Sequence, residues 1–122
     1  MLIHDYYTIE SNSIEGGIGD FCIRLNAGCR VYQGHFPGKP VSPGVCNIQM
    51  LKELAELMAG QRLFMNNLQQ CRLTTLITPD EHPTLKANLL LEKIDGGYKL
   101  RAALGQDEAV FLEMKAELTP AK

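Results

Sequence analysis

The sequence predicts an α+β fold in which an antiparallel sheet wraps around one central helix, at about residues 43–59. Two observations carry this prediction. Apolar residues recur at helical spacing in one stretch, from Val45 to Met58. Beyond Gly60 the spacing changes, and apolar residues alternate with polar ones in runs that turn residues separate. A sheet wrapped around a single helix is the simplest way to bury the apolar side of both.

The two ends of the helix carry residues that suit those positions. Ser42 is a suitable N-cap, and Pro43 would then take the first helical position. Gly60 suits the C-terminal cap. The polar residues of the helix lie within roughly 100° of one another and form one stripe. These residues are Gln49, Lys52, Glu53 and Glu56. We expect the stripe to be a solvated face and the rest of the helix to be enclosed.

Strands are predicted on both sides of the helix. Residues 11–19 are rich in Ser, Asn, Glu and Gly, which indicates a turn between short strands. Phe21, Ile23 and Leu25 occupy alternate positions, as in a half-buried strand. After the helix we expect strands at 68–77, 85–91, 98–104 and 109–118.

Size and composition favour one domain that spans residues 1–122. The chain has 122 residues, of which 45% are hydrophobic, and this is enough for a packed core. Its formal net charge of −2 gives no support for nucleic-acid binding. No apolar run approaches the roughly 20 residues that a membrane span needs.

The N-terminal residues and the cysteines favour a reduced, cytoplasmic location. Residues 1–6 lack the basic start and the apolar stretch of a signal peptide. The four cysteines are scattered, so neither a disulfide framework nor a zinc site is expected. We interpret them as small buried hydrophobic residues.

Residues 34–49 are the most informative stretch for function. They contain three prolines and three glycines, which closely restrict the path of the loop. The loop holds His35 and runs directly into the start of the helix, where free amides favour negative charge. A base beside such amides suits proton abstraction next to a carbonyl group. His4 and His82 have no such surroundings, and we interpret both as structural or surface residues.

Residues 34–45 read Gly-His-Phe-Pro-Gly-Lys-Pro-Val-Ser-Pro-Gly-Val. This stretch resembles the signature of the β-hydroxyacyl-acyl-carrier-protein dehydratases, hot-dog-fold enzymes of fatty acid and polyketide synthesis. The predicted order of strand, loop, central helix and further strands agrees with that fold over essentially the whole chain. The resemblance therefore implies a hot-dog fold. It also implies elimination of water from a β-hydroxyacyl thioester to give the trans-2-enoyl product.

The same resemblance implies roles for individual residues. His35 would be the base that removes the C2 proton, and the backbone N–H of Gly44 would bind the thioester oxygen. Phe36, Pro43 and Val45 would contact the substrate. We expect no metal and no organic cofactor beyond the phosphopantetheine that carries the substrate.

The resemblance also implies partners. The acyl group would arrive on an acyl carrier protein or as a coenzyme A thioester. Because the family's site forms between two subunits, the chain would be a homodimer or higher oligomer, or a heterodimer with a related subunit.

One position departs from the family pattern. The family's acid falls at Gln49, whose amide can hydrogen-bond a hydroxyl group but cannot protonate it as a carboxylic acid does. Glu53 stands one turn later on the same helix face. Three hypotheses remain open: Glu53 acts as the acid, His35 works alone, or the protein binds an acyl chain or a partner subunit with little activity. A related subunit could also supply the acid. A hot-dog thioesterase is a further alternative, although thioesterases usually lack this loop.

Overall fold

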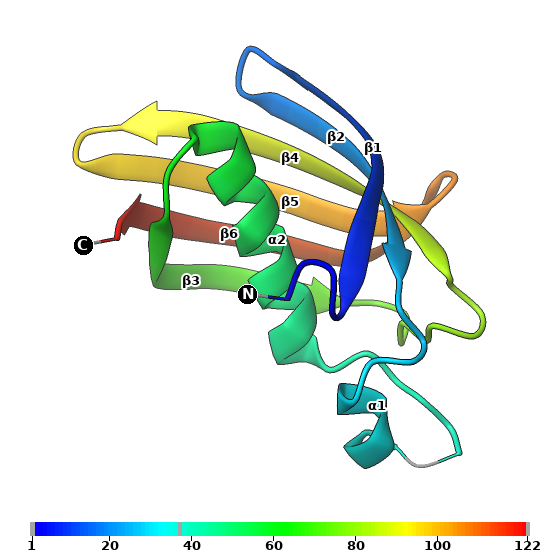
Figure 1. The fold of residues 1–122 in the computed structure, drawn as a ribbon. Helices are drawn as coiled ribbons and strands as arrows, with labels where there is room; N and C mark the ends of the chain where they lie inside the picture. The colour runs from blue at the N-terminus through cyan, green and yellow to red at the C-terminus, as the bar shows by residue number, and fades with distance from the viewer. Residues whose placement is uncertain (1, 37, 122) are drawn as a thin grey trace.

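The computed structural model describes residues 2–36 and 38–121, so Pro37 of the loop lies outside the described residues. Within them, six strands form one antiparallel sheet, and one long helix lies across one face of it (Figure 1). The strands are β1 Tyr7–Glu15, β2 Ile18–Leu25, β3 Leu63–Leu73, β4 Thr84–Ile94, β5 Gly97–Gln106 and β6 Ala109–Pro120. Their order in the sheet is β1-β2-β4-β5-β6-β3, so β1 and β3 are the edges. The α+β prediction is confirmed.

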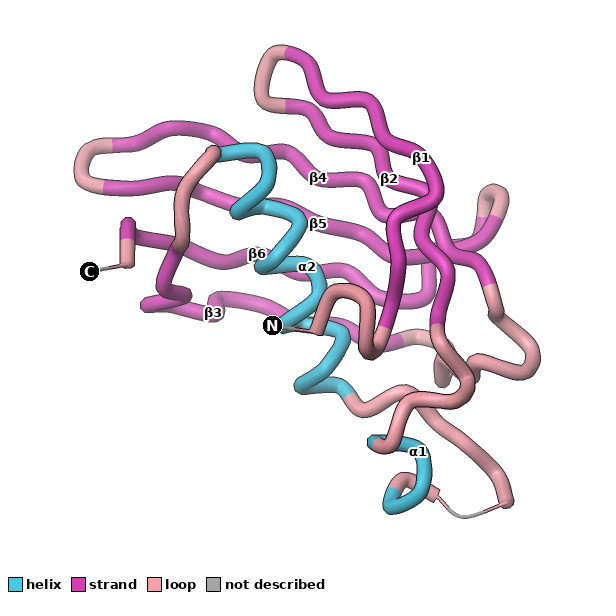
Figure 2. Tube along the Cα trace, in the orientation of Figure 1, coloured by secondary structure: helices cyan, strands magenta, loops and turns pink. Residues whose placement is uncertain are grey.

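The core lies between the sheet and the long helix, α2 Gly44–Ala59 (Figure 2). Each central strand buries alternate residues, because successive side chains of a strand point to opposite faces. On β4 the buried residues are Leu85, Ala87, Leu89 and Leu91. On α2 they include Met50, Leu51 and Leu54. The apolar spacing of the sequence therefore predicts the core-facing side of both elements.

The ends of α2 agree with the sequence prediction at Gly60 and differ at Ser42. Gly60 is the C-cap, with a left-handed φ of 70°, and its N–H donates to the Glu56 carbonyl at 2.9 Å. The N-cap is Pro43, with extended backbone, and Gly44 is the first helical residue. The Ser42 side chain makes no capping bond, because its hydroxyl pairs with Tyr32 instead.

The predicted solvated stripe on α2 is wrong. The side chains of Glu53 and Glu56 are buried, at 1% and 9% exposed, whereas the apolar Val45 and Leu57 are 76% and 50% exposed. A buried carboxylate needs hydrogen-bond donors, and both glutamates have them. Glu56 accepts the Leu63 N–H at 2.8 Å at the start of β3, so it ties the end of the helix to the next strand.

Three other boundaries differ from the prediction. The first edge strand, β1, is continuous to Glu15, and the turn to β2 occupies only Gly16 and Gly17. The other edge strand, β3, begins at Leu63 and ends at Leu73, whereas 68–77 was predicted. Most of its side chains are exposed, which removes the alternation that marks a half-buried strand. A short helix, α1 Val31–Gly34, precedes the loop and was not predicted.

Among the residues that the structure describes, neither helix combines the length and the apolar character needed to cross a lipid bilayer.

We predict that Glu56→Ala lowers the free energy of unfolding by about 1–3 kcal/mol, because it leaves the buried Leu63 N–H without an acceptor. Glu56→Gln retains a side-chain oxygen and should cost less. Glu117 accepts a hydrogen bond from Asn67 at the surface, so Glu117→Ala should stay within about 0.5 kcal/mol of the wild type. Urea unfolding measures all three variants. Equal effects of Glu56→Ala and Glu117→Ala would contradict the role of the buried carboxylate.

Candidate active site

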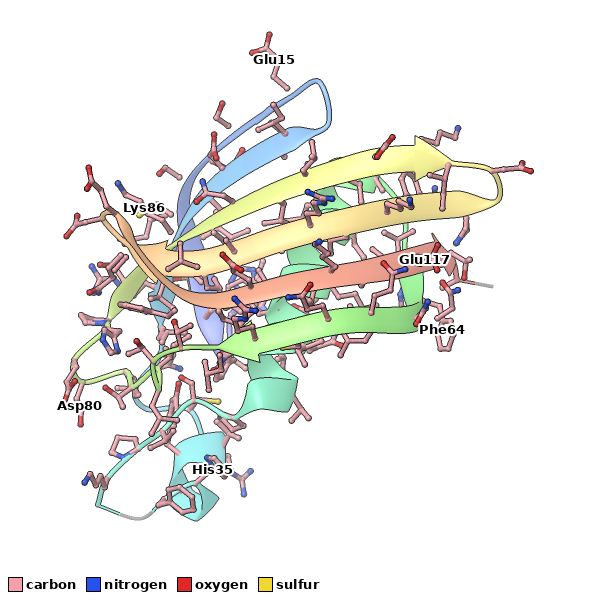
Figure 3. The ribbon with its side chains drawn as sticks, turned by 180° about the vertical axis from the view of Figure 1, so that it is seen from behind. Glu15, His35, Phe64, Asp80, Lys86 and Glu117 are labelled. Carbon is pink, nitrogen blue, oxygen red and sulfur yellow. The ribbon has the colours of Figure 1, made fainter. Side chains whose placement is uncertain are left out.

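The loop that carries His35 is closed by hydrogen bonds at its base. The Val41 N–H donates to the His35 carbonyl at 2.9 Å, and the His35 ring nitrogen Nδ1 lies 3.0 Å from the Val41 carbonyl oxygen. Phe36 and Lys39 exchange two further backbone bonds, at 3.3 and 3.0 Å. The His35–Phe36 peptide bond is cis. Figure 3 shows His35 beyond the β3 edge of the sheet, at the end of α1.

The bond to Val41 decides which nitrogen of His35 is free. A carbonyl oxygen can only accept, so Nδ1 carries the hydrogen and donates it. In the neutral ring, the other nitrogen, Nε2, carries the lone pair and can act as a base. The ring is half-buried and stacks on Phe36, with 4.4 Å between ring centroids. The loop therefore holds the imidazole in a restricted orientation.

Gly44 places a free backbone donor at the start of α2. The Pro43 carbonyl accepts from Cys46 and Asn47, whereas the Gly44 N–H has no acceptor among residues 2–36 and 38–121. The first amides of a helix have no partner within the helix and favour negative charge. A Cβ atom built on Gly44 meets nothing within 4 Å, and its φ is not positive. The fold of this chain alone therefore does not require glycine here, and the space beside its Cα atom is open.

A buried polar cluster lies beneath the start of α2. The Tyr32 and Ser42 hydroxyls are 2.9 Å apart, and the Tyr6 hydroxyl donates to Asn47 Oδ1 at 2.7 Å. The two tyrosine rings stack, with centroids 6.0 Å apart. Burial raises the pKa of both tyrosines above the ordinary value, so both hydroxyl groups stay protonated. Since Tyr32 belongs to α1 and Ser42 precedes Gly44, this cluster holds the His35 side of the loop against the Gly44 side.

Sequence reasoning missed this cluster. Asn47 was the available signal, because it is a polar residue that shares a helix face with the apolar Met50, Leu51 and Leu54. Its hydrogen-bond partner, Tyr6, lies 41 residues away in the sequence, and no local pattern links the two.

Glu53 is turned toward the N-terminal residues. Its Oε2 accepts from the Leu2 backbone N–H at 2.7 Å and from Gln49 Nε2 at 2.9 Å. Its Oε1 accepts from the Ile3 backbone N–H at 3.0 Å and from the Tyr7 hydroxyl at 3.1 Å. Two carboxylate oxygens offer about four lone-pair positions, so these donors occupy all of them.

The candidate residues thus fall into two groups. His35 and Gly44 stand on either side of the closed loop, with buried Pro43 and exposed Val45 beside Gly44 and exposed Phe36 beside His35. Gln49 is half-buried on α2 and is joined to Glu53. An open groove of about 430 Å³ near α1 is lined partly by Tyr32 and Phe36. In one chain the His35 region therefore lies at the surface.

A family model described as ApeI dehydratase, of the ApeI-like family, matches residues 12–111. The chain belongs to the ApeI-like dehydratase family. The match covers the loop, the whole of α2 and most of the sheet.

Curated relatives of this ApeI-like chain are 3-hydroxyacyl-[acyl-carrier-protein] dehydratases named FabZ. That of Levilactobacillus brevis is 27% identical over 91 residues, which cover 68% of this chain and 62% of the relative. Those of Enterococcus faecalis and Pelotomaculum thermopropionicum are each 30% identical, with 66% and 68% of this chain and 57% and 65% of the relative covered. The chain thus spans less than two thirds of the length of these relatives.

Two solved structures share the fold. The dehydratase heterocomplex ApeI:P from Xenorhabdus doucetiae contains a chain that is 17% identical, with a TM-score of 0.72 over 91% of this chain and 96% of that one. An uncharacterized protein from Erwinia carotovora subsp. atroseptica is 16% identical, with a TM-score of 0.67 and 93% of each chain covered. The hot-dog architecture implied by the loop motif is confirmed.

We predict that Tyr32→Phe lowers the free energy of unfolding by about 1–3 kcal/mol, because the buried Ser42 hydroxyl loses its partner. Tyr98 is the matched control, since its hydroxyl accepts from Gln61 at the surface. Tyr98→Phe should change stability by less than about 0.5 kcal/mol. Chemical denaturation gives both values, and a Tyr32→Phe variant as stable as Tyr98→Phe would show that the cluster does not hold the loop.

Proposed function

We propose that this chain is a dehydratase subunit that removes water from β-hydroxyacyl thioesters and forms the trans-2-enoyl product. The proposed substrates are the carrier-bound β-hydroxyacyl thioesters of fatty acid, polyketide or polyene synthesis. The phosphopantetheine of the carrier protein holds the acyl group. One observation carries the proposal: Val41 accepts the Nδ1–H of His35, which leaves Nε2 as the basic nitrogen, and the same loop leads into the helix-start amide of Gly44. Membership of a dehydratase family supports the same chemistry.

The proposed reaction begins at C2 of the acyl group. His35 Nε2 takes the C2 proton, and the electron pair shifts toward the thioester carbonyl, where the Gly44 N–H stabilises the negative charge on oxygen. One such donor typically contributes about 3 kcal/mol to lowering a barrier. The electron pair then forms the C2=C3 double bond while the C3–O bond breaks. The leaving hydroxyl takes up a proton and departs as water.

The source of that last proton is the open step. Glu53 does not supply it in this proposal, because all four of its lone-pair positions accept hydrogen bonds. Gln49 binds the hydroxyl and cannot protonate it. Two sources remain: the proton that His35 has just received, and an acid on a second chain.

The edge strand β3 is the proposed contact with that second chain. Its backbone groups on the outer side have no strand partner in the sheet, and an edge of this kind is a template for pairing with another chain. It exposes several large apolar residues, namely Phe64, Leu68 and Leu73. A second copy of this chain and a related subunit are both compatible with this edge, and a solved neighbour of the fold is itself a heterocomplex.

A second candidate function is a non-catalytic subunit that binds the acyl chain or completes a partner's site. The observation that favours it is the amide at position 49 together with the fully occupied carboxylate of Glu53. A chain of this kind would retain the fold and the loop without turning over substrate.

We predict that His35→Ala lowers the dehydration rate about 10²–10⁴-fold, the usual contribution of a general base. His4 is the matched control, because it is exposed and its positive φ of 75° is tolerated by asparagine. His4→Asn should keep full activity. The assay follows enoyl formation from β-hydroxyacyl carrier substrates, with the wild type alone and with a candidate partner subunit. Activity that survives His35→Ala would remove His35 as the base, and an inactive wild type under both conditions would favour the non-catalytic subunit.

We predict that Gly44→Ala separates function from folding. Alanine is the better helix former and its Cβ meets no atom here, so stability should stay equal or rise by up to about 1 kcal/mol. Turnover should fall about 10–100-fold, because the methyl group displaces the substrate from the amide. Thermal unfolding and the enoyl assay measure the two effects. Full turnover, or a large loss of stability, would contradict the assignment of Gly44.

We predict that Phe64→Glu, on the β3 edge, weakens subunit association, whereas Ile14→Glu, on the β1 edge, does not. The two residues are exposed by 60% and 44%, so each substitution removes an exposed apolar group from an edge strand. Sedimentation of each variant against the wild type measures the change in mass. A dimer that survives Phe64→Glu and dissociates with Ile14→Glu would place the interface on β1 and contradict the proposed contact through β3.

A further inference from the structure

The hydrogen bond between Gln49 and Glu53 has a direction. Glu53 accepts at both oxygens, so the group of Gln49 that faces it is Nε2–H, at 2.9 Å. The Gln49 amide is therefore not free to exchange the places of its oxygen and nitrogen. Its carbonyl oxygen Oε1 points away from Glu53, together with the one N–H that remains.

The other partners of Glu53 make this direction rigid. The Leu2 and Ile3 N–H groups belong to the backbone, and the Tyr7 phenol is buried. Burial raises the pKa of Tyr7 well above its ordinary value, with a further contribution from the charge of Glu53, so this hydroxyl stays protonated and donates. Residues 2–7 themselves form a tight hook, in which the His4 N–H donates to Tyr7 and the Asp5 and Tyr6 N–H groups donate to Leu2.

We infer that Glu53 is a positioning residue that makes Gln49 a hydrogen-bond acceptor toward the substrate, so that the site selects a β-hydroxyl group over a β-ketone. This inference rests on the proposed function. A hydroxyl group can donate to Oε1 and accept from the remaining N–H, whereas a ketone oxygen can only accept. The preference follows from the orientation of one amide, and that orientation is set by the N-terminal hook through Glu53.

Glu53→Gln should reverse the orientation. A glutamine offers one oxygen in place of two, and the fixed backbone amides of Leu2 and Ile3 compete for it. Its NH₂ group then faces Gln49, which must turn its own Oε1 inward to accept. Gln49 would present N–H groups to the substrate, and these favour a ketone.

The test compares the binding of β-hydroxyacyl and β-oxoacyl pantetheine thioesters of equal chain length, in the same oligomeric preparation that the enoyl assay uses. We expect the wild type to prefer the hydroxyacyl thioester, and Glu53→Gln to reduce that preference about tenfold, the value of roughly one hydrogen bond. Glu56→Gln is the matched control, since it makes the same change in a buried glutamate of α2 that does not contact Gln49. It should leave the preference unchanged.

If Glu53→Gln does not fold, a double variant that exchanges the two side chains still tests the inference. The double variant Gln49→Glu with Glu53→Gln retains the charge and the hydrogen bond between the two positions, and it again presents an acceptor. It should restore the hydroxyacyl preference. In the wild type, the side-chain N–H signal of Gln49, assigned by its loss in Gln49→Met, should exchange slowly with solvent.

Three outcomes would overturn the inference. A folded Glu53→Gln with an unchanged preference overturns it and leaves the dehydratase proposal standing. A Gln49 side-chain N–H that exchanges as fast as those of exposed glutamines does the same. Wild type that binds neither thioester overturns the inference and the proposed function together.

Discussion

The hydrogen bonds to the Glu53 carboxylate determine how the N-terminal residues, the central helix and the proposed site fit together. The group is 1% exposed, and a charge buried in this way is tolerated only because four donors surround it. Two of those donors come from the backbone of Leu2 and Ile3, about 50 residues away. The side of α2 that would otherwise face water is therefore covered by residues 2–7, and the Gln49 amide is oriented by the same group.

The loop before α2 is the second segment that hydrogen bonds hold in place. His35 and Val41 bind one another through backbone and side chain, and Tyr32 reaches across to Ser42 at the base of the same loop. These hydrogen bonds link residues in or beside the same loop, so they hold the imidazole and the Gly44 amide in place before any substrate arrives. Preorganisation of this kind is what makes a helix-start donor effective against a developing negative charge. In the proposed mechanism, His35 would be the base and the Gly44 N–H the anion donor. The Glu53 carboxylate on α2 is already occupied by four hydrogen-bond donors, so the proposal takes the proton for the leaving group from elsewhere.

The sequence predicted the features that depend on local pattern. Alternation at Phe21, Ile23 and Leu25 predicted β2, and helical spacing with Gly60 predicted α2 to within about a residue at its end. Features that depend on hydrogen-bond partners in other elements of the fold were missed. Glu53 and Glu56 are polar in sequence and buried in the fold, because their donors come from the N-terminal hook and from Leu63. The strand β3 was misplaced because an edge strand with mostly exposed side chains shows no alternation. The loop motif predicted His35 and Gly44, but neither Tyr6 nor Tyr32, which hold the surrounding backbone in place.

We propose above all that this chain carries the proton-abstracting half of a dehydratase site, whichever group supplies the acid. Exchange of the C2 hydrogens of a saturated acyl pantetheine thioester with deuterium oxide tests this half alone, because a substrate without a hydroxyl group needs no acid. We expect the wild type in its assembled form to catalyse the exchange and His35→Ala not to catalyse it. Exchange that is equal in the two proteins, or absent from a wild type that binds the thioester, would contradict it.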